Sequence, residues 1–77
     1  MPSEYSEKIK EIMTRELGQL GVFVIKKQCK NLGIDPDNIK KEDIPQLAKA
    51  LGNVMKTFGG PEKGVKIENE IKRLMRQ

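Results

Sequence analysis

Hydrophobic residues recur every three or four positions along most of this chain, which is the spacing of one face of an α-helix. The first stripe comprises Tyr5, Ile9, Ile12, Met13, Leu17 and Leu20. Ser3 precedes it as a candidate N-cap, and Glu4 and Glu7 place negative charge near the positive end of the helix dipole. We therefore predict a first helix over residues 3–17.

Two glycines, Gly18 and Gly21, interrupt this pattern. Gly18 can act as a helix C-cap, so a second helix would run from residue 19 or 20 to residue 32. Because the stripe continues through residues 20 and 24, one long helix kinked at the glycines is an alternative. The run Val22–Ile25 also resembles a buried strand, but the chain offers no partner strand, so we reject that interpretation.

The second helix has a clear end signal. Gly33 is suited to the left-handed position after a helix, and Ile34 can then fold back toward Cys29 as in a Schellman motif. The sequence Asp35-Pro36-Asp37-Asn38 is typical of a turn. We expect Ile39 to anchor this loop to the core.

A third helix is predicted over residues 44–58. Asp43 and Gln46 have the spacing of a capping pair, and Pro45 falls in the first turn, where a missing N–H has no cost. The apolar face comprises Ile44, Leu47, Ala48, Leu51, Val54, Met55 and Phe58. Gly59 and Gly60 end this helix.

Pro61 opens a fourth helix that extends to about residue 75. Its apolar residues are Val65, Ile67, Ile71, Leu74 and Met75. Gly64 weakens its first turn by up to about 1 kcal/mol relative to alanine. Four acid-first pairs at i and i+4 are expected to stabilise the helix surfaces: Glu4–Lys8, Glu11–Arg15, Glu62–Lys66 and Glu68–Lys72.

These elements predict one all-α domain over residues 1–77, a small bundle of three to four helices with short loops. A chain of 77 residues has a thin core, and with two Phe, one Tyr and no Trp that core must be aliphatic. Charged residues make up 34% of the chain, with both signs interspersed, which favours a folded domain over disorder.

The location of the protein is suggested by what its sequence lacks. A single cysteine permits no internal disulfide, which small secreted domains usually need. The longest apolar run is only four residues, Val22–Ile25, and the first twenty residues contain no signal segment. We therefore expect a cytoplasmic protein with no membrane association.

Catalytic chemistry is not expected. The chain contains no histidine, so the commonest general base and metal ligand are both missing. One cysteine without a histidine forms neither a nucleophile pair nor a zinc site. We predict no enzymatic activity, no metal and no cofactor. Cys29 lies on an apolar stripe and is interpreted as a small buried hydrophobic residue, the alternative being a thiol activated by neighbouring lysines.

Two further segments resemble ligand sites but do not match them. The acidic residues near Asp35 would need glycine at the sixth position of a calcium loop, where Lys40 stands. The glycine-rich segment 59–64 lacks the hydroxyl residue of a phosphate-binding loop, since Val65 and Lys66 follow Gly64. Both are interpreted as turns.

The most informative segment for function is Val22–Ile25. Successive helical residues are 100° apart, so four consecutive apolar residues point around most of the helix. One small core has difficulty covering all four, so we expect an apolar side chain at the surface. We predict docking to another chain, or self-association, through Val22, Phe23 and Val24.

An alternative function is weak nucleic-acid binding by a basic surface. This surface would comprise Lys26, Lys27, Lys30, Lys49 and Lys56, which stand in segments poor in acidic residues and contribute to a net charge of +4. The absence of arginine from these segments counts against this function, because arginine binds phosphates and bases in a bidentate manner. Lys26, Lys27 and Lys30 would also form the charged rim of a protein-docking surface.

Two segments of the chain resemble parts of small uncharacterised archaeal helical proteins. They are residues 27–37, KQCKNLGIDPD, and residues 42–51, EDIPQLAKAL. The resemblance covers 21 of the 77 residues and includes no functional motif. It implies a helical fold and an archaeal source, and it implies no activity or site residue.

Overall fold

The computed structural model describes residues 2–76 and contains four α-helices, with no strand among these residues. The helices are α1 (Glu4–Leu17), α2 (Leu20–Leu32), α3 (Ile44–Gly59) and α4 (Pro61–Lys72). Two short 3-10 turns, η1 (Lys41–Asp43) and η2 (Arg73–Arg76), precede α3 and follow α4. The predicted all-α bundle is confirmed.

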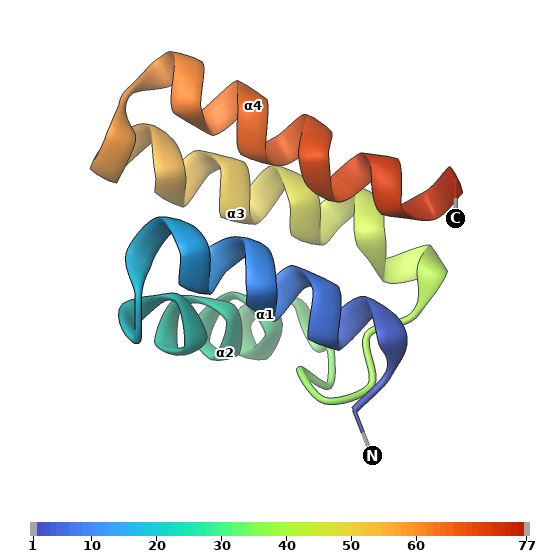
Figure 1. The fold of residues 1–77 in the computed structure, drawn as a ribbon. Helices are drawn as coiled ribbons and strands as arrows, with labels where there is room; N and C mark the ends of the chain where they lie inside the picture. The colour runs from blue at the N-terminus through green and yellow to red at the C-terminus, as the bar shows by residue number, and fades with distance from the viewer. Residues whose placement is uncertain (1, 77) are drawn as a thin grey trace.

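The four helices form two antiparallel hairpins, α1–α2 and α3–α4, packed as two layers (Figure 1). Both hairpin turns lie at the same end of the molecule, which we call the turn end and define as residues 17–23 and 58–65. The start of α1 and the end of η2 lie at the opposite end.

The start of α1 binds the loop that connects the two hairpins. Ser3 is the N-cap of α1, as predicted, and its Oγ accepts a hydrogen bond from the Ser6 amide at 3.1 Å. The Ser3 hydroxyl also donates to the carbonyl of Ile39 at 2.8 Å, and the Ile39 amide donates to Ser6 Oγ at 2.9 Å. Ile39 is 1% exposed, so this residue anchors the loop as expected.

Two separate helices, rather than one kinked helix, precede that loop. Gly18 adopts φ +63° and ends α1, which resolves the alternative left open by the sequence. Gly21 explains why α2 returns so close to α1, because a Cβ built on Gly21 would lie 2.6 Å from the carbonyl carbon of Met13. A side chain at this position would push the two helices apart.

The end of α2 is the predicted Schellman motif. Gly33 has φ +73°, and its amide donates to the carbonyl of Lys30 at 3.3 Å. The Ile34 amide donates to the carbonyl of Cys29 at 2.8 Å. Both hydrogen bonds occupy carbonyls that would otherwise lack partners at the helix end.

The predicted capping pair of α3 is wrong. Asp43 has a helical backbone (φ −81°, ψ −18°) and makes no side-chain cap with α3. Its carboxylate instead accepts a hydrogen bond from the Lys40 amide at 3.0 Å, and its own amide donates to the Lys40 carbonyl at 2.9 Å. Asp43 therefore closes the η1 turn that leads into α3, because the chain is already helical before Ile44.

Helices α3 and α4 approach each other closely at two glycines. A Cβ on Gly64 would lie 2.6 Å from the Gly52 carbonyl oxygen, and one on Gly52 would lie 3.0 Å from the Gly64 carbonyl oxygen. The small residues of α3 at positions 48 and 52 are both buried, so they serve an internal helix contact. Gly64 is therefore required by packing, despite its low helix propensity.

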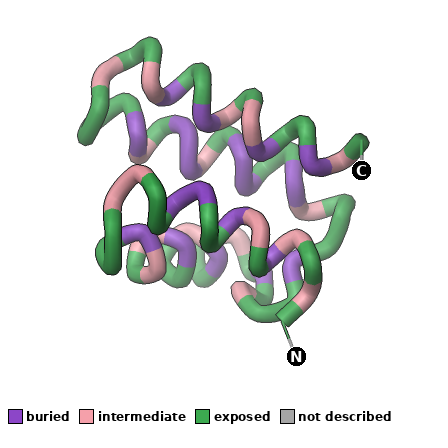
Figure 2. Tube along the Cα trace, in the orientation of Figure 1, coloured by how far each residue is buried: buried purple, intermediate pink, exposed green. Residues whose placement is uncertain are grey.

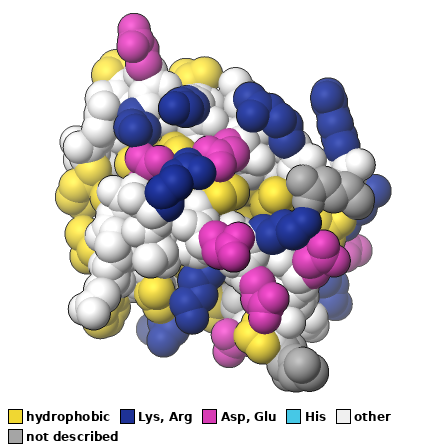
Figure 3. Space-filling view, in the orientation of Figure 1, with side chains coloured by type: hydrophobic (Ala, Val, Ile, Leu, Met, Phe, Trp, Pro, Cys, Tyr) yellow, Lys and Arg dark blue, Asp and Glu magenta, His cyan; other side chains and the backbone are white. Residues whose placement is uncertain are grey.

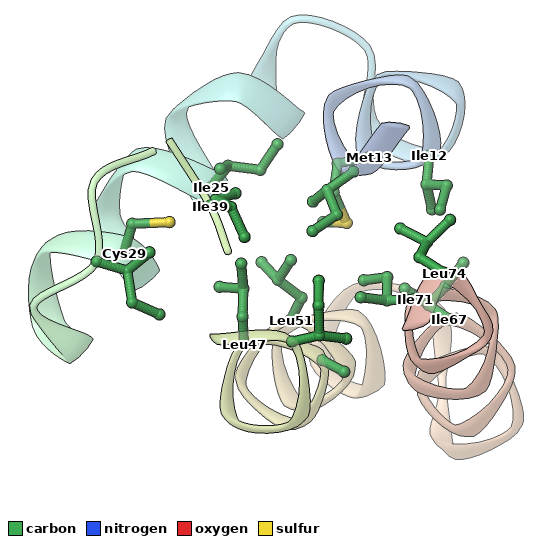
Figure 4. Packing of buried hydrophobic residues seen from close by; sticks show 14 of the residues in the cluster. Ile12, Met13, Ile25, Cys29, Ile39, Leu47, Leu51, Ile67, Ile71 and Leu74 are labelled. Carbon is green, nitrogen blue, oxygen red and sulfur yellow. The ribbon is translucent and has the colours of Figure 1, made fainter. Parts of the chain in front are cut away.

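The core lies between the two layers and is aliphatic, as the composition predicts (Figures 2 and 4). Its members are Ile9, Ile12, Met13, Ile25, Cys29, Ile34, Ile39, Ile44, Leu47, Ala48, Leu51, Met55, Ile67, Ile71 and Leu74. Phe58 was expected on the core face of α3 but is 59% exposed. It lies in the last turn of α3, at the turn end of the bundle.

A chain of four alternating charges connects the two layers. Arg15 on α1 donates two hydrogen bonds to the Glu70 carboxylate of α4, at 2.7 and 2.8 Å, and contacts Glu16 at 3.0 Å. Glu16 pairs with Lys63 at 2.9 Å. Hydrogen bonds from Lys63 and Arg15 lower the pKa of Glu16, and those from Arg15 lower the pKa of Glu70.

The i and i+4 pairs predicted from the sequence are confirmed only in part. Glu4–Lys8 and Glu68–Lys72 form, at 3.1 and 2.9 Å. Among residues 2–76 there is no Glu11–Arg15 or Glu62–Lys66 ion pair. Arg15 turns instead toward α4, where it donates two hydrogen bonds to the Glu70 carboxylate.

Candidate interaction surface

The three apolar residues predicted to dock a partner differ in their exposure to solvent. Phe23 is 72% exposed, whereas Val22 and Val24 are half-buried. Val24 packs against the core cluster, and Ile25, the fourth residue of the run, is 5% exposed and belongs to it. Of this run, Phe23 is thus the residue with a large apolar surface in solvent.

Phe23 lies at the centre of the outward face of α2. With 100° per residue, Leu20, Phe23, Lys26, Lys27 and Lys30 fall within an arc of about 120°. All five are exposed. The buried residues Gly21, Ile25 and Cys29 lie on the opposite side of the helix. We call these five exposed residues the α2 outward face.

Within residues 2–76, the lysines of this face have no ion-pair partner. No carboxylate among the residues described lies within 4 Å of the ammonium group of Lys26, Lys27 or Lys30. The segment between Gly18 and Ile34 contains no acidic residue at all. The α2 outward face therefore combines an exposed aromatic ring with three uncompensated positive charges.

The two predicted basic residues of α3 have different surroundings. Lys49 and Lys56 are exposed, and their charges lower the pKa of Glu68 on α4, after the larger effect of the Lys72 hydrogen bond. The Lys56 side chain also lies against Gly64. These lysines therefore belong to the α3–α4 hairpin surface, where a carboxylate partly balances them.

Further exposed apolar residues gather at the turn end. Leu20 is 47% exposed, Phe58 59% and Val65 50%. Together with Phe23, each lies within about one helical turn of a hairpin turn, an axial distance of roughly 6 Å or less. Figure 3 shows hydrophobic side chains along the edge of the molecule where the two turns lie. Both phenylalanines of the chain are thus at the surface, at one end.

Sequence reasoning missed three of these residues, assigning Leu20, Phe58 and Val65 to core stripes. For Val65 a signal was present, because it points about 150° away from Ile67, Ile71 and Leu74 on a helical wheel. Phe58 does lie on the same face of α3 as the buried residues, and it is exposed only because it stands at the end of the bundle. No local pattern could reveal that, since it depends on where the other hairpin stops.

Val22 lines a small hollow between α1, α2 and the loop that follows α2. The hollow has a volume of about 270 Å³. It is lined by Pro2, Ser6, Glu7, Lys10, Val22, Ile25, Lys26, Pro36 and Asp37. Its walls carry charges of both signs, and the buried hydroxyl of Ser6 is already hydrogen-bonded to Ile39. The hollow therefore shows no unsatisfied polar group directed at a ligand.

The one thiol of the chain lies in the core and not at the surface. Cys29 is fully buried in the core, and burial raises the pKa of its thiol to about 11. Nowhere in the described part of the chain do three or more His, Cys, Asp or Glu residues gather to hold a metal ion. Exposed apolar and basic side chains are the distinctive surface features that remain.

The chain matches no protein-family model, no curated protein and no solved structure. The arrangement of its own residues is therefore the basis for any functional conclusion. Within residues 2–76, no helix has the length and apolar character needed to span a membrane.

Proposed function

We propose that this protein is a cytoplasmic helical interaction module, which acts by docking an apolar surface against another protein chain rather than by catalysis. The observation that carries the proposal is the exposure of Phe23, 72% of which is in solvent at the centre of the α2 outward face. A phenylalanine contributes roughly 1.5–3 kcal/mol when it is fully buried. In this fold most of the Phe23 ring stays in solvent, so most of that burial free energy remains available for binding a partner.

The surroundings of Phe23 support the proposal. Exposed apolar residues that occur singly are normal, whereas a group of them marks interaction sites. Leu20, Phe58 and Val65 are exposed at the same end of the molecule as Phe23. Aromatic residues that contribute strongly to binding are typically surrounded by polar groups, a role that the lysines of the α2 outward face can fill.

The test compares wild-type protein with Phe23→Glu. Because Phe23 is mostly exposed, the variant should keep its helical circular dichroism and its stability to within about 0.5 kcal/mol. Sedimentation equilibrium over a range of concentrations detects self-association, and affinity capture followed by mass spectrometry detects other partners. The association should be present in wild type and lost in the variant.

Asn69→Glu is the matched control, because it adds the same charge at an exposed position of α4. It should associate as wild type does. The proposal is wrong if Phe23→Glu unfolds the domain, which would make Phe23 structural. It is also wrong if Phe23→Glu self-associates to the same degree as wild type and captures the same proteins in the same amounts.

A second candidate function is weak binding of single-stranded nucleic acid. The observation that favours it is the position of Phe23 beside Lys26, Lys27 and Lys30, since aromatic stacking and basic side chains together bind single strands. Against it, α2 carries no second aromatic residue and no arginine. Titration of a labelled oligonucleotide at two salt concentrations tests it, because phosphate binding weakens steeply with salt.

A further inference from the structure

We infer that the α2 outward face docks an acidic amphipathic helix of a different protein, an inference that rests on the proposed function and specifies its partner. Every part of this face is exposed, from Leu20 to Lys30. The partner segment would present apolar side chains to Leu20 and Phe23 and carboxylates to the three lysines.

The charge of the face selects an acidic partner. Lys8, Lys63 and Lys72 each have a carboxylate within 3.1 Å, whereas the three lysines of α2 have none among the residues described. Three positive charges within little more than one turn of one helix repel one another and any basic surface. Carboxylates placed opposite them would relieve this repulsion and speed association.

The order of residues along α2 further defines the partner. Leu20 and Phe23 occupy the first turn, while Lys26, Lys27 and Lys30 follow at three, four and seven positions after Phe23. The face is therefore apolar at one end and positive at the other over about 15 Å. A complementary segment needs about three helical turns, with its apolar residues concentrated at one end.

A second copy of this chain is a poor occupant for the same face. Two α2 helices packed against each other would bring six lysines into one interface with no carboxylate from either helix. Like charges brought together in this way disfavour association. A nucleic acid would satisfy the charge, but it would leave Leu20 without an apolar partner.

The experiment uses three fluorescent synthetic peptides of about 18 residues, long enough to form a helix. The first carries leucines at helical spacing near one end, glutamates on the same face toward the other end, and alanine elsewhere. The second replaces each glutamate with lysine, and the third keeps the glutamates but replaces the leucines with serine. Fluorescence anisotropy during titration with the whole protein gives the affinity of each peptide.

We expect wild type to bind the acidic amphipathic peptide at least about tenfold more tightly than either of the others. Phe23→Ser should weaken that binding by about tenfold or more, since it removes the apolar anchor. The triple variant K26Q/K27Q/K30Q should also weaken it and should reduce its dependence on salt.

The matched control is K40Q/K41Q/K66Q, which removes the same net charge from exposed positions outside α2. It should bind the acidic peptide nearly as wild type does. Equal losses in the two triple variants would show that net charge alone drives binding and would overturn the inference. Preference for the basic peptide, or for the leucine-free acidic peptide, would overturn it as well.

Two further measurements separate this inference from the proposed function. If no acidic peptide binds but wild type self-associates through Phe23, the partner is a second copy, and only the inference fails. If a labelled oligonucleotide binds through the α2 lysines and no peptide does, the surface recognises nucleic acid. If no association of any kind depends on Phe23, the inference and the proposed function fail together.

Discussion

The close contact between α3 and α4 gives a prediction opposite to the one made from helix propensity. Alanine is favoured over glycine inside a helix by about 1 kcal/mol, so Gly64→Ala in α4 would be expected to stabilise the protein. The structure places the new methyl group 2.6 Å from the Gly52 carbonyl oxygen and 3.1 Å from the Lys56 amide nitrogen. Both atoms belong to the backbone of α3, so no side-chain rotation can relieve the clash.

The expected change in the free energy of unfolding is the difference between the gain in helix propensity and the cost of the backbone clash. A methyl group needs a separation of more than 3 Å from a carbonyl oxygen, so α3 and α4 must move apart. That movement opens gaps around Leu51, Met55 and Ile67, which pack tightly in the core. Overpacking typically costs about 1–3 kcal/mol, and the gain in helix propensity offsets part of it. We expect a net loss of about 1–2 kcal/mol.

Urea and thermal unfolding followed by circular dichroism measure this effect. For a domain of this size the predicted loss lowers Tm by about 5–15 °C. Gly59→Ala is the comparison variant, because its Cβ would meet side-chain atoms of Lys63, Cγ at 2.8 Å and Cβ at 3.1 Å, rather than backbone. Its stability should fall by less than that of Gly64→Ala, because the Lys63 side chain can shift more readily than the backbone of α3. A Gly64→Ala protein as stable as wild type, or more stable, would refute this account of the interface.

Three other predictions concern groups with defined partners. Glu70→Gln should reduce the free energy of unfolding by about 0.5 kcal/mol near pH 7, because the pair with Arg15 is partly exposed. Since Arg15 lowers the pKa of Glu70 in the folded state, this contribution is complete above the unfolded-state pKa of about 4.3 and disappears as pH falls through the lower folded-state value. Urea unfolding of wild type and Glu70→Gln at several pH values checks this, because the difference in stability should shrink as the pH falls. Ser6→Ala should cost about 1–3 kcal/mol in urea unfolding, because the buried Ile39 amide loses its acceptor; a loss of a few tenths would show that water replaces it. Cys29 should react with a thiol reagent only as fast as the protein unfolds, since it is buried with a thiol pKa of about 11, and rapid labelling of the native protein would contradict its burial.

The features that could be predicted from sequence are those encoded within a few residues. Ser3 caps α1 and Gly33 ends α2 with a Schellman motif, because both signals depend only on neighbouring backbone groups. The aliphatic core was predictable from helical periodicity and the shortage of aromatic residues. Function has no such local code, because a docking surface depends on which side chains stay exposed after the helices have packed.

The features that could not be predicted depend on which helix faces meet. Arg15 has an acid four residues before it, yet it pairs with Glu70, which is 55 positions away and offers a bidentate contact. Gly64 was judged by propensity alone because its neighbour Gly52 lies on another helix. Asp43 has the spacing of a cap, but the η1 turn makes the chain helical too early for it to act as one.

Because both hairpin turns lie at one end of the bundle, a label or linker at the opposite end leaves the exposed apolar residues accessible. The 14 residues of α1 separate its first residue from the turn end by about 20 Å. A tag, dye or surface linker joined near residue 2 or residue 76 therefore lies at the end of the bundle opposite the turn end, which carries Phe23 and Phe58. Immobilised by either of these positions, the protein would hold its exposed aromatic rings outward, within reach of any molecule in the surrounding solution.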